Sequence, residues 1–367
     1  MLTTAAVLDS LNQPFRIEEM EIDEPRPGEV LVQLVGTGVC HTDALAQHGD
    51  FPFAFPGVLG HEGAGTVVAV GEGVTSVAEG QAVLIGWPWC GSCHNCLDGQ
   101  PRYCEQLGPL VFQGGREDGS TALRTRDGDA VHSHFFGQSS FAGHAITSAN
   151  SLVRVPPQMD LSTAGPLGCG IATGAGAVLN VLKPRPGSSL VVFGAGNVGL
   201  AGVMAARSSG ATTIVAVDRH ADRLKLAREL GATETIDVAD GDVIEAIKDI
   251  CGGPAELALE CTGNLGVVRQ AIDSIGPRGT CALVGAAPFG AEFTVEHGPT
   301  LWGKRIVGVL GGEGTSVSLI GALIELHLQG RFPFDRLIQP FPLDQINEAM
   351  AASHSGEVLK PVLRMPS

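Results

Sequence analysis

The chain has 367 residues, more than one average domain, so its length favours two domains. Its 39 acidic residues outnumber 23 lysines and arginines, giving a formal net charge of -16, and the lack of a basic cluster argues against a nucleic-acid partner. Apolar residues make up 44% and charged residues 17%, a composition that excludes a disordered chain and favours a large core.

The first ten residues contain neither a basic segment nor an apolar stretch of signal-peptide length, so we expect a cytoplasmic protein. The most apolar window, 190–206, is interrupted by glycines and Asn197, so we predict no membrane span there. Nine cysteines in a chain of this kind favour thiolate chemistry or metal binding over a disulfide framework.

Short strand-like runs broken by glycine and proline dominate the first part of the chain, from Ala5 to about Val155. They lie at 30–35, 65–70, 82–85, 141–147 and 152–155. This pattern predicts a strand-rich domain with many loops.

Four cysteines of this first part have the spacing C-x2-C-x2-C-x7-C: Cys90, Cys93, Cys96 and Cys104. The short spacers let a turn present several sulfurs to one ion, and the fourth thiolate completes a tetrahedron. We interpret them as a structural zinc site with no open position for chemistry. An iron–sulfur cluster is the alternative, because C-x2-C-x2-C resembles part of a ferredoxin sequence, although the proline expected after the fourth cysteine is missing.

Three further metal-binding residues, Cys40, His61 and Cys169, lie in glycine-containing segments far apart in the sequence. Two cysteines and one histidine are a recognised ligand set for a catalytic zinc, which keeps a fourth position open. Their spacing does not establish a site, since a single cysteine is commonly a small core residue and a single histidine a hydrogen-bonded one.

From about Leu190 onward, apolar strands alternate with helices. Strands are predicted at 190–193, 213–218, 256–261, 281–285 and 301–310, and helices from Asn197 and through 223–230. This alternation predicts an α/β domain with a doubly wound parallel sheet. We place it at 166–310, and assign 1–165 and 311–367 to the strand-rich domain.

A glycine-rich loop, Gly194-Ala-Gly-Asn-Val-Gly199, follows the first of these strands and opens a helix, and Asp218 ends the next strand. That context is typical of a dinucleotide site, where the helix N-terminus receives the pyrophosphate and the acid binds the adenosine ribose. Asp218 predicts NAD rather than NADP. Arg219 and Arg223 leave NADP open, because arginines can bind a 2′-phosphate.

The segments GHEGAGTVV and CHTD and the four-cysteine lobe occur together, so the chain resembles zinc-dependent medium-chain alcohol dehydrogenases over about residues 5–365. The resemblance implies a GroES-like catalytic domain beside a Rossmann domain, NAD as cofactor and two zinc ions per chain. It implies that Cys40, His61 and Cys169 bind the catalytic zinc, with Glu62 behind the metal. Asp43 would orient His61, and Thr42 would lie next to the substrate oxygen.

The resemblance also assigns residues around the cofactor. The basic groups His41 and Lys360 would contact the pyrophosphate, and Thr173 and Val198 the nicotinamide. The other implied cofactor residues are Gly194, Gly196, Asn197, Gly199, Asp218, Arg219, Arg223, Thr262 and Val284.

The implied substrate wall contains Phe51, Trp87, Phe135, Phe136 and Val309, and is rich in aromatics although these make up only 5% of the chain. Such a wall suits a planar apolar alcohol, unless these aromatics are ordinary core. Residues 134–141 are similar to the aryl or benzyl alcohol dehydrogenase branch, with allylic alcohols such as geraniol as close alternatives.

One departure and two alternatives remain. Leu45 stands where some relatives end their proton relay at a histidine, and His48 is a candidate outlet. The glutathione-dependent formaldehyde dehydrogenase branch needs a basic group soon after the fourth lobe cysteine, which is missing here. A non-catalytic dinucleotide-binding relative would lack the zinc ligands.

The apolar strand at 301–310 predicts a covered sheet edge and, with the resemblance, a homodimer or a tetramer.

Overall fold

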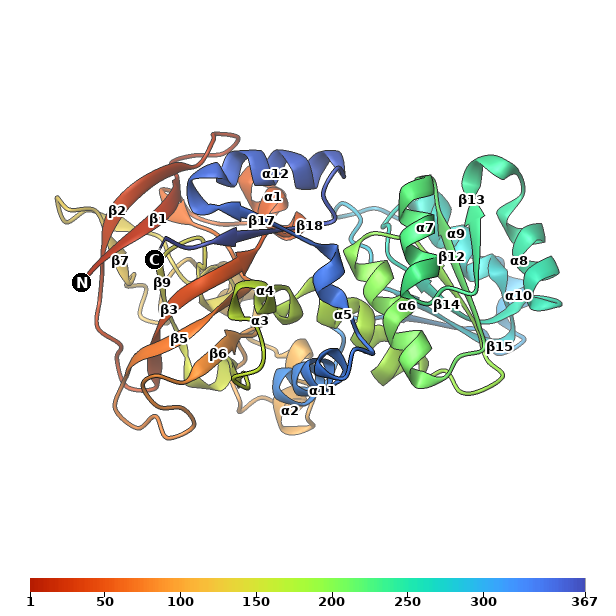
Figure 1. Cartoon of the computed structure of the whole chain (residues 1–367), viewed down its shortest axis with the longest axis horizontal. Coiled ribbons are helices and arrows are strands. Elements are labelled where there is room, and N and C mark those ends of the chain that lie inside the picture. Colours follow the sequence, from red (N-terminus) through yellow and green to blue (C-terminus); the bar gives the residue numbers. More distant parts are fainter. Residues whose placement is uncertain (367) are drawn as a thin grey trace. The chain divides into compact units, whose positions relative to one another are not determined.

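The computed structural model describes residues 1–366, which are shown along the chain in Figure 1. They form two compact units. The first contains residues 1–169, 314–328 and the chain from Asp335 onward, and the second contains 170–313 and 329–334. The units change at 169 and 313, where the sequence predicts boundaries at 165 and 310, and the short segment 329–334 was not foreseen as part of the second unit.

The first unit is built on two sheets. The five-stranded sheet has the order β4-β1-β2-β7-β8: Gly57–Val58, Leu2–Leu8, Arg16–Ile22, Leu123–Arg124 and Ala130–Val131. The seven-stranded sheet has the order β10-β6-β5-β3-β18-β17, with β9 paired to β3: Leu152–Arg154, Ala82–Ile85, Gly63–Val70, Glu29–Gly38, Lys360–Arg364, Ile338–Pro342 and His144–Ser148. The predicted strand at 141–147 begins only at His144, since Ala142 makes just an isolated bridge to Ala5.

The end of the chain returns to the first unit, as predicted. Strand β18 pairs antiparallel with β3, with Val362 opposite Gly38. The helices of this unit are α1 to α4, α11 and α12: His41–His48, His94–Leu97, Leu107–Phe112, Leu161–Ala164, Ser316–Leu328 and Ile346–Ser355. Because β18 joins a central strand, Lys360 at its start is fixed beside the segment that leads from β3 into α1.

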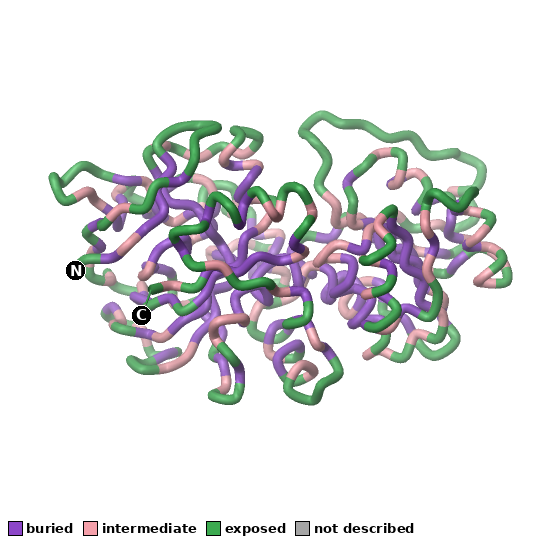
Figure 2. Tube along the Cα trace, turned by 45° about the horizontal axis from the view of Figure 1, so that its top comes forward, coloured by how far each residue is buried: buried purple, intermediate pink, exposed green. Residues whose placement is uncertain are grey.

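The second unit contains a parallel six-stranded sheet of order β13-β12-β11-β14-β15-β16: Glu234–Asp237, Thr213–Asp218, Ser189–Phe193, Ala255–Glu260, Ile275–Leu283 and Arg305–Gly308. The helices are α5 to α10: Gly170–Gly176, Asn197–Ser209, Ala221–Leu230, Val243–Cys251, Leu265–Ser274 and His297–Thr300. The earliest strand, β11, is central, which is the doubly wound arrangement. Figure 2 shows buried residues concentrated along the strands of each unit.

Three strand predictions of the second unit need correction. Strand β13 was not predicted, because it is short and its residues are mostly half-buried or exposed. Strand β15 begins at Ile275 rather than 281. The strand predicted at 301–310 spans only Arg305–Gly308, because Leu301 to Gly303 form a turn after α10, but it does lie at the sheet edge.

Within residues 1–366, no single helix is both long and apolar enough to cross a membrane. One bent pair, Leu161–Gly168 with Gly170–Leu182, meets the same criterion by length and composition only.

Candidate metal centres and cofactor loop

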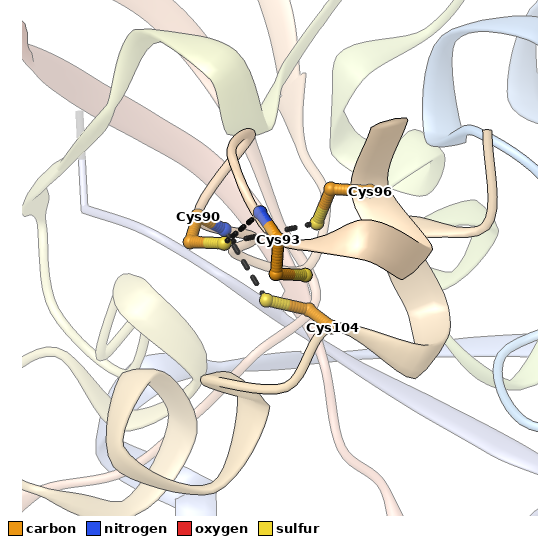
Figure 3. A group of neighbouring side chains, drawn as sticks. All are labelled: Cys90, Cys93, Cys96 and Cys104. Atoms are coloured by element: carbon orange, nitrogen blue, oxygen red, sulfur yellow. Dashed lines mark hydrogen bonds between the residues drawn. The ribbon is translucent and has the colours of Figure 1, made fainter. Parts of the chain in front are cut away.

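The four lobe cysteines converge, as Figure 3 shows. Their sulfurs all lie within 4.8 Å of one another, and Cys90 Sγ is 3.9 Å from Cys96 Sγ. Sulfurs bound at 2.3 Å to one tetrahedral zinc are about 3.8 Å apart, so the spacing fits that ion. All four cysteines are free thiols.

Backbone N–H groups of this lobe donate hydrogen bonds to cysteine sulfurs, which stabilises the thiolate form. The amide of Cys93 donates to Cys90 Sγ, and the amide of Gln106 to Cys104 Sγ, each at 3.4 Å. Hydrogen bonds from the backbone at Ser92 and Cys93 lower the pKa of Cys90 to about 6. Burial raises the pKa of Cys96 to about 12 and also raises that of Cys104, so the backbone favours the thiolate, the form that binds metal, at Cys90 and Cys93 but not at all four sulfurs.

The second cluster joins three segments of the first unit. Cys40 caps α1 just after β3, His61 precedes β5, and Cys169 follows α4 and a 3-10 turn. Their ligand atoms and a carboxylate oxygen of Glu62 lie within 4.8 Å of one another. The structure thus brings together the three residues that the spacing alone could not connect.

Asp43 holds the His61 imidazole in place. Its Oδ1 accepts a hydrogen bond from His61 Nδ1 at 2.9 Å and from the amide of Gly60 at 3.2 Å, while Oδ2 accepts from the amide of Cys40 at 2.9 Å. Burial lowers the pKa of His61, but the Asp43 carboxylate outweighs it and holds that pKa well above its usual value.

The other imidazole nitrogen, His61 Nε2, is buried and has no hydrogen-bond partner within residues 1–366. A buried polar atom without a partner is costly, so this nitrogen fits a metal ligand. Hydrogen bonding from Cys169 holds the pKa of Cys40 well below its usual value, and the same bond holds the pKa of Cys169 well above it. A cation would displace the proton that the two sulfurs share.

Glu62 and Lys360 form a fully buried ion pair beside the cluster. Lys360 Nζ donates to both Glu62 carboxylate oxygens at 2.9 and 3.0 Å and to the Val39 carbonyl at 3.0 Å. Burial raises the pKa of Glu62 to about 7, against the opposing effect of Lys360. Contact of Lys360 with a pyrophosphate stays a prediction, and it requires the ammonium to leave Glu62.

Gly38 makes room for this pair. A Cβ at Gly38 would lie 1.8 Å from Glu62 Oε2, so only glycine fits at that point of β3.

Thr42, in the first turn of α1, has its Oγ1 3.7 Å from Cys40 Sγ. His41, next to it, is exposed.

Aromatic rings cover one side of His61. Phe136 stacks on the imidazole with ring centroids 4.6 Å apart, and Trp87 meets Phe136 edge-on at 5.0 Å. Phe112 lies 5.8 Å from Phe136 and 5.2 Å from Phe51. The sequence had not singled out Phe112, because α3 carries no motif.

Two predicted wall residues differ from this arrangement. Phe135 also packs edge-on against His61, at 5.7 Å, but it is completely buried within the apolar core. Val309 belongs to the second unit, just after β16, and its place in a substrate wall stays a prediction.

The glycine loop of the second unit has the expected form. It follows β11, Gly194 has φ +92°, and Gly196 caps α6 without a side-chain hydrogen bond. A Cβ at Gly199 would lie 1.8 Å from the Gly194 carbonyl oxygen. Asn197 and Val198 begin α6, whose amides face the loop. A Cβ at Gly174 would lie 1.8 Å from the Val198 carbonyl, so α5, which carries Thr173, packs closely on α6.

Asp218 braces this loop from the end of β12. Its Oδ2 accepts the Ala195 amide at 2.6 Å, and its Oδ1 accepts the amides of Arg219 and His220 and the His220 ring. These hydrogen bonds overcome burial and lower the pKa of Asp218. The sequence had missed His220, which had no motif position. Arg223 follows in the first turn of α7.

The two remaining cofactor candidates both bond to one buried residue that the sequence had also missed, Glu260. The Thr262 amide donates to Glu260 Oε1 at 2.6 Å, and the Val284 amide to the Glu260 carbonyl at 2.9 Å. Both residues therefore lie at the carboxyl ends of β14 and β15, the edge at which parallel sheets bind ligands.

Comparison with known proteins gives consistent matches. Residues 26–157 match the alcohol dehydrogenase GroES-like domain, and residues 197–326 match the zinc-binding dehydrogenase family. The chain is 43% identical over 367 residues to the geraniol dehydrogenase of Castellaniella defragrans, covering 98% of this chain and 96% of that protein.

Two solved structures are similar over 100% of both chains. One is an alcohol dehydrogenase zinc-binding domain protein from Burkholderia ambifaria, with 49% identity and a TM-score of 0.99. The other is the benzyl alcohol dehydrogenase from Acinetobacter calcoaceticus, with 40% identity and a TM-score of 0.96.

Proposed function

The chain belongs to the zinc-dependent medium-chain alcohol dehydrogenases, and on that premise we propose that it oxidises a primary aromatic or allylic alcohol of the benzyl type. The balanced reaction is R-CH2OH plus NAD+ giving R-CHO, NADH and H+, and it is reversible. The observation that carries the substrate class is the aromatic cluster of Phe136, Trp87 and Phe112: Phe136 stacks on the imidazole of His61, and Trp87 and Phe112 meet Phe136 edge-on.

The donor atoms fit two zinc ions. Cys40, Cys169 and His61 Nε2 would hold a catalytic ion, and the four lobe cysteines would hold a structural one. When bound, the catalytic zinc would act as a Lewis acid on the substrate oxygen. The family membership favours zinc over the iron–sulfur alternative at the lobe.

The residues of the chain position the substrate and carry its proton. Asp43 holds the His61 ring so that Nε2 faces the ligand cluster. Thr42 Oγ1, close to Cys40 Sγ, is placed to accept the proton of the substrate hydroxyl. Leu45 cannot pass that proton on, so we assign the outlet to His48, an exposed residue at the end of α1 whose ring lies 6.4 Å from that of His354.

NAD is the proposed dinucleotide because Asp218 is an ionised acid at the end of β12, where the ribose hydroxyls bind. Its charge repels the 2′-phosphate of NADP. Three of the four hydrogen bonds to Asp218 go to Oδ1, so Oδ2 keeps an acceptor position for a ribose hydroxyl.

The edge strand β16 supports a homodimer as the working form. Leu301 and Trp302, which precede this strand, are 71% and 69% exposed, and apolar groups at an open sheet edge favour pairing with a second copy. Sedimentation of the purified protein tests this assignment.

Turnover of benzyl alcohol, geraniol and ethanol with NAD tests the substrate class. We expect kcat/KM for benzyl alcohol or geraniol to exceed that for ethanol by at least about tenfold, because each buried CH2 contributes about 0.8 kcal/mol. A preference for ethanol contradicts the aromatic wall. Oxidation of formaldehyde only in the presence of glutathione would instead place the chain in the formaldehyde dehydrogenase branch.

A further inference from the structure

One buried cation of the first unit has no role in the mechanism above. Arg102 lies in the 3-10 turn Pro101–Tyr103, two residues before the lobe cysteine Cys104, and only 3% of its surface is exposed. Its Nε has no hydrogen-bond partner, and no carboxylate pairs with the guanidinium within residues 1–366. Buried charges in proteins are nearly always paired, because removing a charge from water is costly.

The neighbours of Arg102 connect it to the catalytic cluster. Its guanidinium carbon lies 4.9 Å from the centre of the Trp87 ring. Trp87 contacts Phe136, and Phe136 stacks on His61. Arg102 therefore lies at one end of a row of aromatic rings whose other end is the proposed metal ligand His61.

A second donor on the same wall is also unsatisfied. Trp87 Nε1 is buried and has no hydrogen-bond partner in the described chain. Contact with the Trp87 ring attracts the guanidinium, but the ring offers no acceptor to its N–H groups and does not replace a counter-ion. Two adjacent buried donors without an acceptor fit a ligand that brings an acceptor of its own.

The lobe fold fixes Arg102 in this position. Asn95 Nδ2 donates to the Tyr103 carbonyl at 2.7 Å, and the Cys104 amide donates to the Pro101 carbonyl at 3.1 Å. These bonds hold the turn on both sides of Arg102. The backbone that carries Arg102 is therefore fixed, which reduces the entropy lost when a ligand binds its side chain.

We propose that Arg102 is a specificity residue that binds a carboxylate carried by the alcohol substrate, so that the preferred substrates are aryl alcohols with an acidic substituent. This inference rests on the proposed function, because it refines the substrate class of the same site. The aromatic wall would hold the ring of the substrate, and the guanidinium would donate two hydrogen bonds to the substrate carboxylate. A chain of net charge -16 needs such a local cation to bind an anionic substrate.

The first arm of the test compares 4-(hydroxymethyl)benzoate with 4-(hydroxymethyl)benzamide, together with the two 3-isomers, as substrates of the zinc-loaded protein. Carboxylate and amide have nearly the same shape and differ in charge. We expect kcat/KM for one carboxylate isomer to exceed that of its amide by about 10- to 100-fold, the range of a charge-assisted hydrogen bond. Equal or lower values for both carboxylates overturn the proposal without any variant.

The variants locate the effect. Arg102→Met is expected to reduce the carboxylate-to-amide ratio to about 1, and Arg102→Lys to retain part of it. The matched control is Arg126→Met, an exposed arginine of the same unit bound to Glu19, which should leave the ratio unchanged. If Arg102→Met alters zinc retention but not the ratio, Arg102 has a structural role and the proposal is wrong.

The second arm measures binding without turnover. Calorimetric titration with 4-methylbenzoate and 4-methylbenzamide, which cannot be oxidised at a hydroxyl, should show tighter binding of the anion by the wild type but not by Arg102→Met. Arg102-dependent binding with no turnover of any alcohol leaves the anion site in place and contradicts the proposed function. Turnover of benzyl alcohol with no preference for the anion supports the proposed function and contradicts the anion site at Arg102.

Discussion

At the scale of single residues, the site depends on buried polar groups whose partners the fold supplies. Asp43 is completely buried and satisfies three donors: the His61 ring and the amides of Cys40 and Gly60. One carboxylate therefore positions two of the three proposed zinc ligands. The resemblance predicted the role of Asp43 toward His61, but the hydrogen bond from the Gly60 amide comes from a chain segment 17 residues away and could not be predicted from spacing.

Asp43→Asn tests this positioning. An asparagine has one acceptor oxygen and a nitrogen that only donates, so either the His61 ring or the Cys40 amide loses its partner and the ligand cluster loses its fixed geometry. We expect zinc affinity or kcat/KM to fall by about 10- to 100-fold, the usual cost of losing a partner behind a metal ligand. Chelator competition measures the affinity. Asp50→Asn, at an exposed position after α1, is the control and should match the wild type.

His134 predicts a pH dependence of stability. Burial and nearby Arg116 lower the pKa of its imidazole to about 4, while its Nδ1 lies 2.8 Å from Ser133 Oγ. Below pH 6.5 the unfolded chain takes up a proton that the folded protein takes up only near pH 4, so stability falls as the pH decreases through this window. The contribution is at most about 1.4 kcal/mol per pH unit.

His134→Asn removes this titration while suiting the left-handed backbone at φ 65°. Urea unfolding at pH 7 and pH 5 measures the effect. The variant should lose less stability than the wild type between the two pH values. An identical loss in both proteins would show that His134 does not contribute.

At the scale of elements, local sequence patterns predicted the glycine loop and the start of α6 correctly, but they did not predict the short, half-exposed strand β13. The glycine loop and the α6 start at Asn197 follow the prediction, because strand, turn glycines and helix N-terminus are encoded within a dozen residues. Strand β13 was missed, since half-exposed residues give no apolar run. Residues 301–303 were assigned to a strand because Leu301 and Trp302 are apolar, yet they are exposed in a turn.

Gly199→Ala tests the loop geometry. The added Cβ would lie 1.8 Å from the Gly194 carbonyl oxygen, which is backbone and cannot move without opening the loop. We expect a loss of about 1–3 kcal/mol of stability, as for overpacked sites, together with weaker NAD binding measured by calorimetry. Gly298→Ala is the control, since a Cβ there meets open space within helix α10. Unchanged NAD affinity in Gly199→Ala would contradict the proposed loop contact.

At the scale of the whole molecule, the sequence predicted a strand-rich domain, a parallel sheet and the return of the C-terminal segment. It could not predict that the three proposed zinc ligands lie close together. Cys40, His61 and Cys169 meet only because β3, β5 and the segment after α4 pack together. The resemblance, not the spacing, placed them at one site. Arg102 lay outside every motif, and only the burial of its unpaired charge distinguishes it from the other arginines.

The most direct test of the central claim combines a metal count with turnover. We expect about two zinc ions per chain, one from the Cys40, His61 and Cys169 cluster and one from the cysteine lobe. NADH formation from benzyl alcohol should disappear when a chelator removes the zinc from the Cys40, His61 and Cys169 cluster and return when zinc is restored. Full activity with one zinc ion or none would contradict the account.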